Sequence, residues 1–152
     1  MKVLLVDDEP FILQGLSVLI DWAAEGCEIV KMASNGKEAL LYLEDHEADL
    51  VITDIKMPVM SGLELLEQIR GRQISDAFFI ILSGYNDFSY AQKAIRYACM
   101  DYLVKPVQKE ALLELIRKAK SSLAVTEQNA ENERWMQEMQ FPSAGEADRR
   151  GA

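Results

Sequence analysis

The residue whose surroundings most favour chemistry is an aspartate, Asp54, at the end of a strand-like stretch. The apolar run Leu50-Val51-Ile52 leads into it, and such a run is typical of a strand buried on both faces. Pro58 then disfavours helix at the residue before it, and Ser61-Gly62 is typical of the next helix start. The sequence therefore predicts a carboxylate held at a strand end. The competing explanation is that the aspartate only accepts hydrogen bonds from backbone amides in a turn or a helix cap.

Four more residues that could take part in chemistry lie at the ends of other apolar runs of strand length: Asp7, Asp8, Ser83 and Lys105. Each has a plain structural interpretation when taken alone, because acidic residues favour a helix N-terminus and serine and lysine are common in turns. Their coincidence at the ends of separate predicted strands favours one common site.

The elements that would position these residues alternate regularly along the chain. Strands are predicted over Val3–Val6, around Ile29–Val30, over Leu50–Ile52, over Phe78–Leu82 and over Tyr102–Val104. Apolar spacing predicts helices through Phe11–Ile20, Ala39–Leu43, Leu63–Ile69, Ala91–Ala98 with Asp87 as N-cap, and Leu112–Ala119. Strands that are apolar throughout and alternate with helices indicate an α/β fold. We expect a doubly wound, flavodoxin-like parallel sheet of order 2-1-3-4-5 with a C-terminal helical extension.

This topology brings the polar residues together, because ligands of such sheets bind at the carboxyl ends of the strands where the strand order reverses. Three carboxylates there, Asp7, Asp8 and Asp54, would repel one another, and a hard divalent cation relieves that repulsion. Oxygen-only ligands favour Mg²⁺. Lys105 adds a positive charge and Ser83 a hydrogen-bond donor. The pattern predicts phosphoryl transfer with Asp54 as nucleophile.

Composition limits the classes of function. The chain has 152 residues, 16 of them basic and 25 acidic, with a formal net charge of −9. This balance argues against direct nucleic-acid binding by this segment and suits a cytoplasmic protein. No secretory signal or run of transmembrane length is visible. Cys27 and Cys99 are expected to be buried free thiols, and His46 a surface residue.

The pattern changes near Ser121, where polar residues begin to dominate. We expect a domain at residues 1–121, a helical extension or linker at 122–140, and a disordered tail at 141–152. Apolar residues keep a four-three spacing that would suit pairing with a second copy, but only over Leu112, Ile116, Ala119 and Leu123.

Four motifs together resemble the receiver domain of two-component response regulators: Val6-Asp7-Asp8-Glu9-Pro10, Thr53–Pro58 with Ser61-Gly62, Leu82-Ser83-Gly84-Tyr85, and Asp101–Pro106. The resemblance covers about residues 1–121. It implies that Asp54 accepts phosphate from a histidine kinase. It also implies that Mg²⁺ is held by Asp7, Asp8, Asp54 and the backbone carbonyl of Lys56.

The same resemblance assigns further roles. Ser83 and Tyr102 would form the switch pair of the family. Lys105 would be its invariant lysine, and the Lys105–Pro106 bond would be cis. Ser83 stands where threonine is frequent, and Gly84 where alanine is common. Such a domain is a phosphoacceptor and not an enzyme acting on other molecules, although it would promote its own phosphorylation from small acyl phosphates and its own dephosphorylation.

The stretch Ser83–Gln92 resembles receivers attached to AraC-type helix-turn-helix transcription factors. This implies a DNA-binding output domain outside this chain, connected after residue 121. On phosphorylation Ser83 would move toward the phosphoryl group and Tyr102 would turn inward, changing the face formed by the fourth helix, fifth strand and fifth helix. Tyr90 and Tyr97 are candidate contacts there, with helix packing as the competing explanation, and a homodimer could form on phosphorylation.

Three alternatives remain open from the sequence. A phosphohydrolase with an aspartyl-phosphate would usually carry an acid two positions after the nucleophile, where this chain has Lys56. A receiver fold could also serve only as a docking module that never meets phosphate. A stand-alone receiver of a phosphorelay is the third alternative.

Overall fold

The computed structural model describes residues 1–84, 89, 92 and 99–140. The elements are β1 (Lys2–Val6), α1 (Pro10–Leu19), β2 (Glu28–Ala33), α2 (Gly36–Asp45), β3 (Leu50–Asp54), α3 (Gly62–Gly71), β4 (Phe78–Ser83), β5 (Asp101–Val104) and α5 (Lys109–Gln140). The predicted helix Ala91–Ala98, its N-cap Asp87, and Tyr90 and Tyr97 lie outside the described residues, as does the predicted tail at 141–152.

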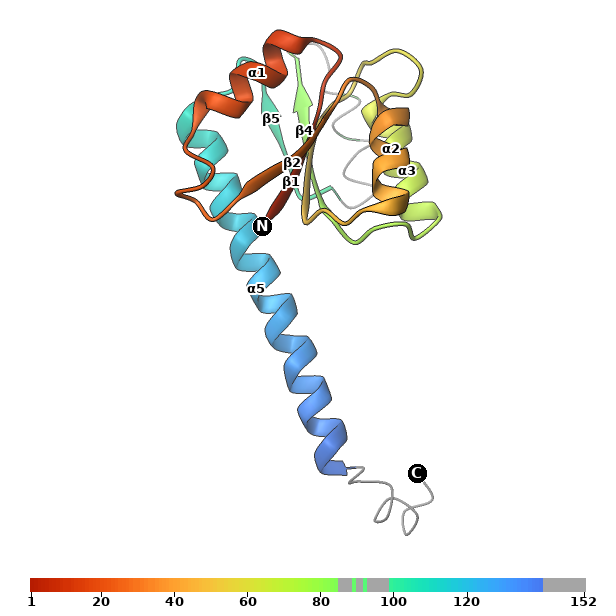
Figure 1. Ribbon diagram of the computed structural model, residues 1–152, viewed down its shortest axis with the longest axis vertical. Coiled ribbons are helices and arrows are strands. Elements are labelled where there is room, and N and C mark those ends of the chain that lie inside the picture. Colours follow the sequence, from red (N-terminus) through yellow and green to blue (C-terminus); the bar gives the residue numbers. More distant parts are fainter. Residues whose placement is uncertain (85–88, 90–91, 93–98, 141–152) are drawn as a thin grey trace. The chain divides into compact units, whose positions relative to one another are not determined.

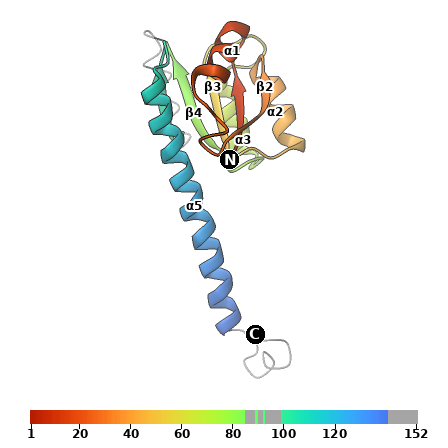
Figure 2. The same cartoon turned by 60° about the vertical axis from the view of Figure 1, so that its left-hand side comes forward.

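The five strands form one parallel sheet of order β2-β1-β3-β4-β5, which confirms the predicted topology (Figure 1). Helices cover both faces of this sheet. The core on one face includes residues of α2 and α3, which lie side by side (Figure 2). The core on the other face includes residues of α1 and of the first turns of α5.

The apolar strands are divided between the two cores by the alternation of their side chains. In β1, Leu4 and Val6 pack toward α2 and α3, whereas Val3 and Leu5 pack toward α1 and α5. Successive residues of a strand point to opposite faces, so a strand between two helical layers must be apolar at every position. This explains why the runs in the sequence were continuous instead of alternating.

Two helix starts near the carboxyl edge of the sheet are fixed by side-chain caps. The Asn35 side chain accepts a hydrogen bond from the Glu38 amide at 2.8 Å. Ser61 and Glu64 form a reciprocal capping box at the start of α3, as Ser61-Gly62 predicted. These caps define where the loops before α2 and α3 end.

Several smaller expectations can be compared with the structure. The Lys105–Pro106 bond is cis, and His46 is exposed just after α2. Both cysteines are free, but only Cys27 is buried. Cys99 is partly exposed because it precedes β5 and only borders the core on the α2 and α3 face.

The C-terminal part of the described chain is helical up to Gln140, where α5 ends. By its contacts the chain divides into two compact units, Met1–Ala119 and Lys120–Ala152. Within the described residues, no helix combines the length and the apolar character needed to span a membrane.

Candidate functional site

An acidic cluster of Asp7, Asp8 and Asp54 lies at the carboxyl edge of the sheet, where β1 and β3 end. These strands are neighbours, and Val6 of β1 is the register partner of Thr53 of β3. Asp7 and Asp54, each the next residue, therefore emerge side by side. One carboxylate oxygen from each of the three aspartates lies within 4.8 Å of the others. The topology thus brings together the acids that the sequence placed at separate strand ends.

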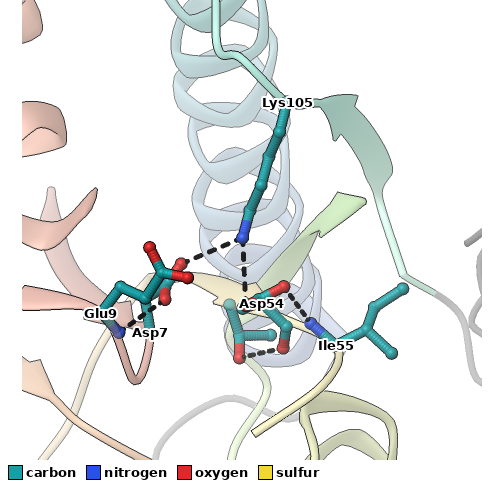
Figure 3. A network of polar contacts seen from close by, with 6 residues as sticks. Asp7, Glu9, Asp54, Ile55 and Lys105 are labelled. Carbon is teal, nitrogen blue, oxygen red and sulfur yellow. Dashed lines mark hydrogen bonds and ion pairs between the residues drawn. The ribbon is translucent and has the colours of Figure 1, made fainter. Parts of the chain in front are cut away.

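Asp7 is the most deeply buried member of the cluster, with no exposed surface. Its Oδ1 accepts a hydrogen bond from the Glu9 amide at 2.9 Å, and its Oδ2 lies 3.3 Å from Lys105 Nζ (Figure 3). Its backbone amide donates to the Ala33 carbonyl at 3.0 Å, which continues the pairing of β1 with β2. The carboxylate is thereby fixed from both sides.

Asp54 is 7% exposed and is held through both carboxylate oxygens. Oδ1 accepts from the Ile55 amide at 2.8 Å, and Oδ2 lies 3.0 Å from Lys105 Nζ (Figure 3). The backbone carbonyl of Asp54 accepts from Thr53 Oγ1 at 2.9 Å. The last residue of β3 therefore presents a carboxylate of defined orientation at the edge of the sheet.

Lys105 reaches the cluster from the end of β5, two strands away from β3. Its amide donates to the Ser83 carbonyl at 2.8 Å, which extends the pairing of β4 with β5 beyond the last strand residue. From there the side chain crosses to Asp7 and Asp54 and is 26% exposed. One ammonium group thus bridges the two buried carboxylates.

Burial and the neighbouring charges shift the pKa values of Asp7 and Lys105. Burial raises the pKa of Asp7, the Glu9 amide lowers it, the Asp54 charge raises it and Lys105 lowers it; the net shift is upward. Burial would lower the pKa of Lys105, but its pairing with Asp54 and Asp7 outweighs burial and raises that pKa. One lysine therefore does not fully compensate the carboxylates, and an oxygen-only donor set with excess negative charge fits a hard divalent cation.

The other predicted site residues lie on β4, on β5 and in the loop after β3. Ser83 is buried at the end of β4, one residue beyond Leu82, the register partner of Asp54. Lys56 lies two residues beyond Asp54 in the loop between β3 and α3. Tyr102 lies on the outer strand β5, opposite Ile81, and is 39% exposed.

The structure also reveals contacts that the sequence analysis missed. Thr53 and Gly62 were quoted only as parts of a motif or an element and given no role of their own, yet Thr53 Oγ1 donates to the Asp54 carbonyl and a Cβ at Gly62 would collide with that carbonyl. One signal was available for Thr53, since a threonine ends an otherwise apolar run directly before the aspartate. The contact of Gly62 could not be found this way, because it depends on the path of the loop.

Comparisons with known proteins agree with the fold. The family model described as "Response regulator receiver domain" matches residues 3–117. A relative described as the uncharacterized transcriptional regulatory protein YesN of Bacillus subtilis (strain 168) is 39% identical over 112 residues, which cover 74% of this chain and 30% of that protein. The transcriptional regulatory protein HptR of Staphylococcus aureus (strain N315) is 42% identical over 115 residues, covering 76% of this chain and 44% of HptR.

Solved structures give the same result. The receiver domain of AraT, a response regulator from Geobacillus stearothermophilus, is 39% identical with a TM-score of 0.77, and the match covers 83% of this chain and 97% of that one. A two-component transcriptional regulator AraC from Clostridium phytofermentans ISDg is 28% identical with a TM-score of 0.74, and the match covers 82% of this chain and 95% of that one. The chain spans less than half the length of the two curated relatives. Its fold, its motifs and the match over residues 3–117 together place this chain in the response regulator receiver domain family.

Proposed function

We propose that this chain is a phosphorylation-controlled switch in which Asp54 accepts a phosphoryl group. The observation that carries the proposal is the position of Lys105 Nζ, 3.0 Å from Asp54 and 3.3 Å from Asp7. A cation held against a buried carboxylate at an otherwise acidic edge suits the charge that develops on a transferring phosphoryl group. Membership of the receiver family supports this function over that of a phosphohydrolase.

The residues present fit a magnesium ion. Asp7, Asp8, Asp54 and the backbone carbonyl of Lys56 would hold it, because three carboxylates with oxygens within 4.8 Å of one another form an oxygen-only donor set of high negative charge. When bound, Mg²⁺ supplies positive charge that offsets both the carboxylates and the oxygens of an incoming phosphoryl group.

The chain's own side chains would then carry the transfer. An Asp54 carboxylate oxygen forms the new bond to phosphorus, while the bond from phosphorus to the donor breaks and the donor leaves with its electron pair. The Lys105 ammonium, which bridges Asp7 and Asp54, pairs with the phosphoryl oxygens as they arrive. The Ser83 hydroxyl, from the next strand, donates a hydrogen bond to one of them. Asp54 oriented through Oδ1 is the nucleophile in this scheme.

The response would pass from Ser83 to Tyr102. We propose that Ser83 moves toward the phosphoryl group and that Tyr102 turns inward from its present half-exposed position on β5. The face that includes β5 and α5 would change and be recognised by a partner or by a second copy.

The wider function extends beyond this chain. The relatives are transcriptional regulators of more than twice the matched length, and one similar structure is titled as an AraC regulator. We therefore propose a cytoplasmic regulator with a histidine kinase as phosphodonor and an AraC-type DNA-binding output domain reached through residues 122–140. The acidic balance of the chain, −9, is consistent with leaving DNA binding to that other domain.

The proposal is tested by mixing the chain with Mg²⁺ and acetyl phosphate and recording its intact mass. We expect a gain of one phosphoryl group that maps to Asp54, no gain in Asp54→Asn, and no gain when the metal is chelated. Asp45→Asn, an exposed carboxylate at the end of α2, is the matched control and should react like the wild type. A wild-type mass that stays unchanged over a wide range of donor concentrations would refute the function.

A further inference from the structure

The peptide group that joins Asp54 to Ile55 is hydrogen-bonded on both of its edges. On one edge, the Asp54 carbonyl accepts from Thr53 Oγ1 at 2.9 Å. On the other edge, the Ile55 amide donates to Asp54 Oδ1 at 2.8 Å. A trans peptide is planar and carries its C=O and N–H on opposite sides, so rotation of this plane would move both contacts at once. The hydroxyl of Thr53 is thereby linked to the orientation of the Asp54 carboxylate.

Gly62, the first residue of α3, lies close to the same peptide group. A Cβ at Gly62 would collide with the Asp54 carbonyl oxygen and lie 3.0 Å from Thr53 Oγ1. The Gly62 amide also donates to the Ile55 carbonyl at 2.8 Å. The absence of a side chain at Gly62 therefore lets the loop close against Asp54, and it leaves the peptide plane little room to turn.

Thr53 is an unusual choice for its position, because it is fully buried in a strand whose preceding residues are apolar. Valine has nearly the same shape and would suit the strand equally well. A buried hydroxyl is unfavourable unless it is hydrogen-bonded, and here its bond goes to the backbone of Asp54. The competing explanation is that the hydroxyl only satisfies that carbonyl, with no effect on the carboxylate beyond it.

We propose that Thr53 is a positioning residue for phosphoryl transfer, an inference that rests on the function proposed above. Its hydroxyl fixes the plane of the 54–55 peptide, the Ile55 amide fixes Oδ1, and Oδ2 is left directed at Lys105. Thr53 itself touches neither the phosphoryl group nor the metal. It acts by keeping the nucleophile in one orientation.

The test compares the wild type with Thr53→Val and Thr53→Ser. Initial phosphorylation rates are measured against acetyl phosphate concentration at saturating Mg²⁺. We expect Thr53→Val to lower the maximal rate about tenfold, with the half-saturating donor concentration changed by less than about twofold, because ground-state binding is unaffected. Thr53→Ser, which keeps the hydroxyl but loses a methyl group from the core, should restore most of the rate. Wild-type rates in Thr53→Val, or a Thr53→Ser variant as slow as Thr53→Val, would overturn the assignment.

A second measurement does not depend on phosphorylation. Amide hydrogen exchange at Ile55 should become faster in Thr53→Val and stay slow in Thr53→Ser, because only the serine variant keeps the hydroxyl that helps to hold the peptide plane. Thr126→Val, at the only other threonine of the chain and exposed on α5, should change neither exchange nor rate. A wild type that never gains mass would refute the proposed function, whereas unchanged protection of Ile55 in Thr53→Val would refute only the role of Thr53.

Discussion

At the scale of single residues, the buried carboxylate of Asp7 is in an environment that disfavours its charge. Burial raises its pKa, and the nearby charge of Asp54 adds to that effect. We expect Asp7→Asn to raise the melting temperature in the absence of Mg²⁺, because a neutral side chain avoids the cost of burying the charge. The same variant should weaken Mg²⁺ affinity by at least about tenfold, since a ligand is lost. Calorimetric titration and thermal melts measure the two effects.

The pH dependence of this comparison follows from the direction of the shift. A carboxyl group with a raised pKa in the folded state destabilises that state above its pKa and no longer does so once it is protonated. The stability advantage of Asp7→Asn should therefore be present at neutral pH and disappear as the pH falls through the raised pKa of Asp7. An advantage that is constant from neutral to acidic pH would contradict the electrostatic explanation.

The meeting of Asp7, Asp54 and Lys105 could be predicted from the sequence, because each lies at the end of a strand and the carboxyl ends of parallel strands share one edge. Their roles in phosphoryl transfer stay predictions. The hydrogen bond from the Thr53 hydroxyl to the Asp54 carbonyl could not be predicted, because the sequence does not show which carbonyl a hydroxyl in a buried strand will reach.

At the scale of elements, the loop from β3 to α3 contains a strained residue. Val59 has a φ of 70° and is 79% exposed, and a β-branched side chain is disfavoured in this left-handed region by about 1 kcal/mol. The loop is nonetheless held at both ends, since the Gly36 amide donates to Met60 and the Gly62 amide to Ile55. The strain is therefore imposed by these anchors.

We expect Val59→Gly to stabilise the protein, because it relieves about 1 kcal/mol of backbone strain. Part of this gain is offset by the larger conformational entropy of glycine in the unfolded chain. Val18 is a matched control, because it is similarly exposed, at 76%, but lies inside α1. Val18→Gly should destabilise by about 0.5 kcal/mol, since glycine disfavours helix. Denaturant unfolding of the two variants measures both values, and effects of the same sign would be inconsistent with strain at Val59.

Strands and helices were predictable wherever apolar residues face a core, and less so elsewhere. β1, β3 and β4 were found because each is buried along almost its whole length. For β2, which spans Glu28–Ala33, only the centre around Ile29–Val30 could be predicted, because an edge strand with few buried residues carries a weak apolar signal. The left-handed turn at Val59 could not be predicted, since valine is not a residue that favours it.

At the scale of the whole molecule, burial along α5 ends well before the helix does. Leu112, Ile116 and Ala119 are fully buried, whereas Val125 and Trp135 are exposed. We expect a chain that ends at residue 121 to melt within about 3 °C of the full chain and to bind Mg²⁺ equally well, because none of the side chains whose burial is described after residue 121 is buried. Thermal melts and calorimetric titration provide the comparison.

A chain that ends before Leu112 provides the contrast. It would remove three fully buried side chains from the core shared with α1, and it should not give a cooperative melt. A large loss of stability on truncation at residue 121 would instead mean that the polar helix contributes to folding. The sequence analysis predicted a helical extension over residues 122–140, and α5 of the structure reaches Gln140.

The direction of the central strand has a practical consequence. β1 begins at Lys2 and ends at Val6, directly before Asp7, and a strand advances about 3.3 Å per residue. The amino group of Met1 and the acidic cluster therefore lie at opposite ends of this strand. A dye or a biosensor surface attached at Met1 would leave the entrance for cations and small donors unobstructed, so that loading of the site could be followed in real time on tethered molecules.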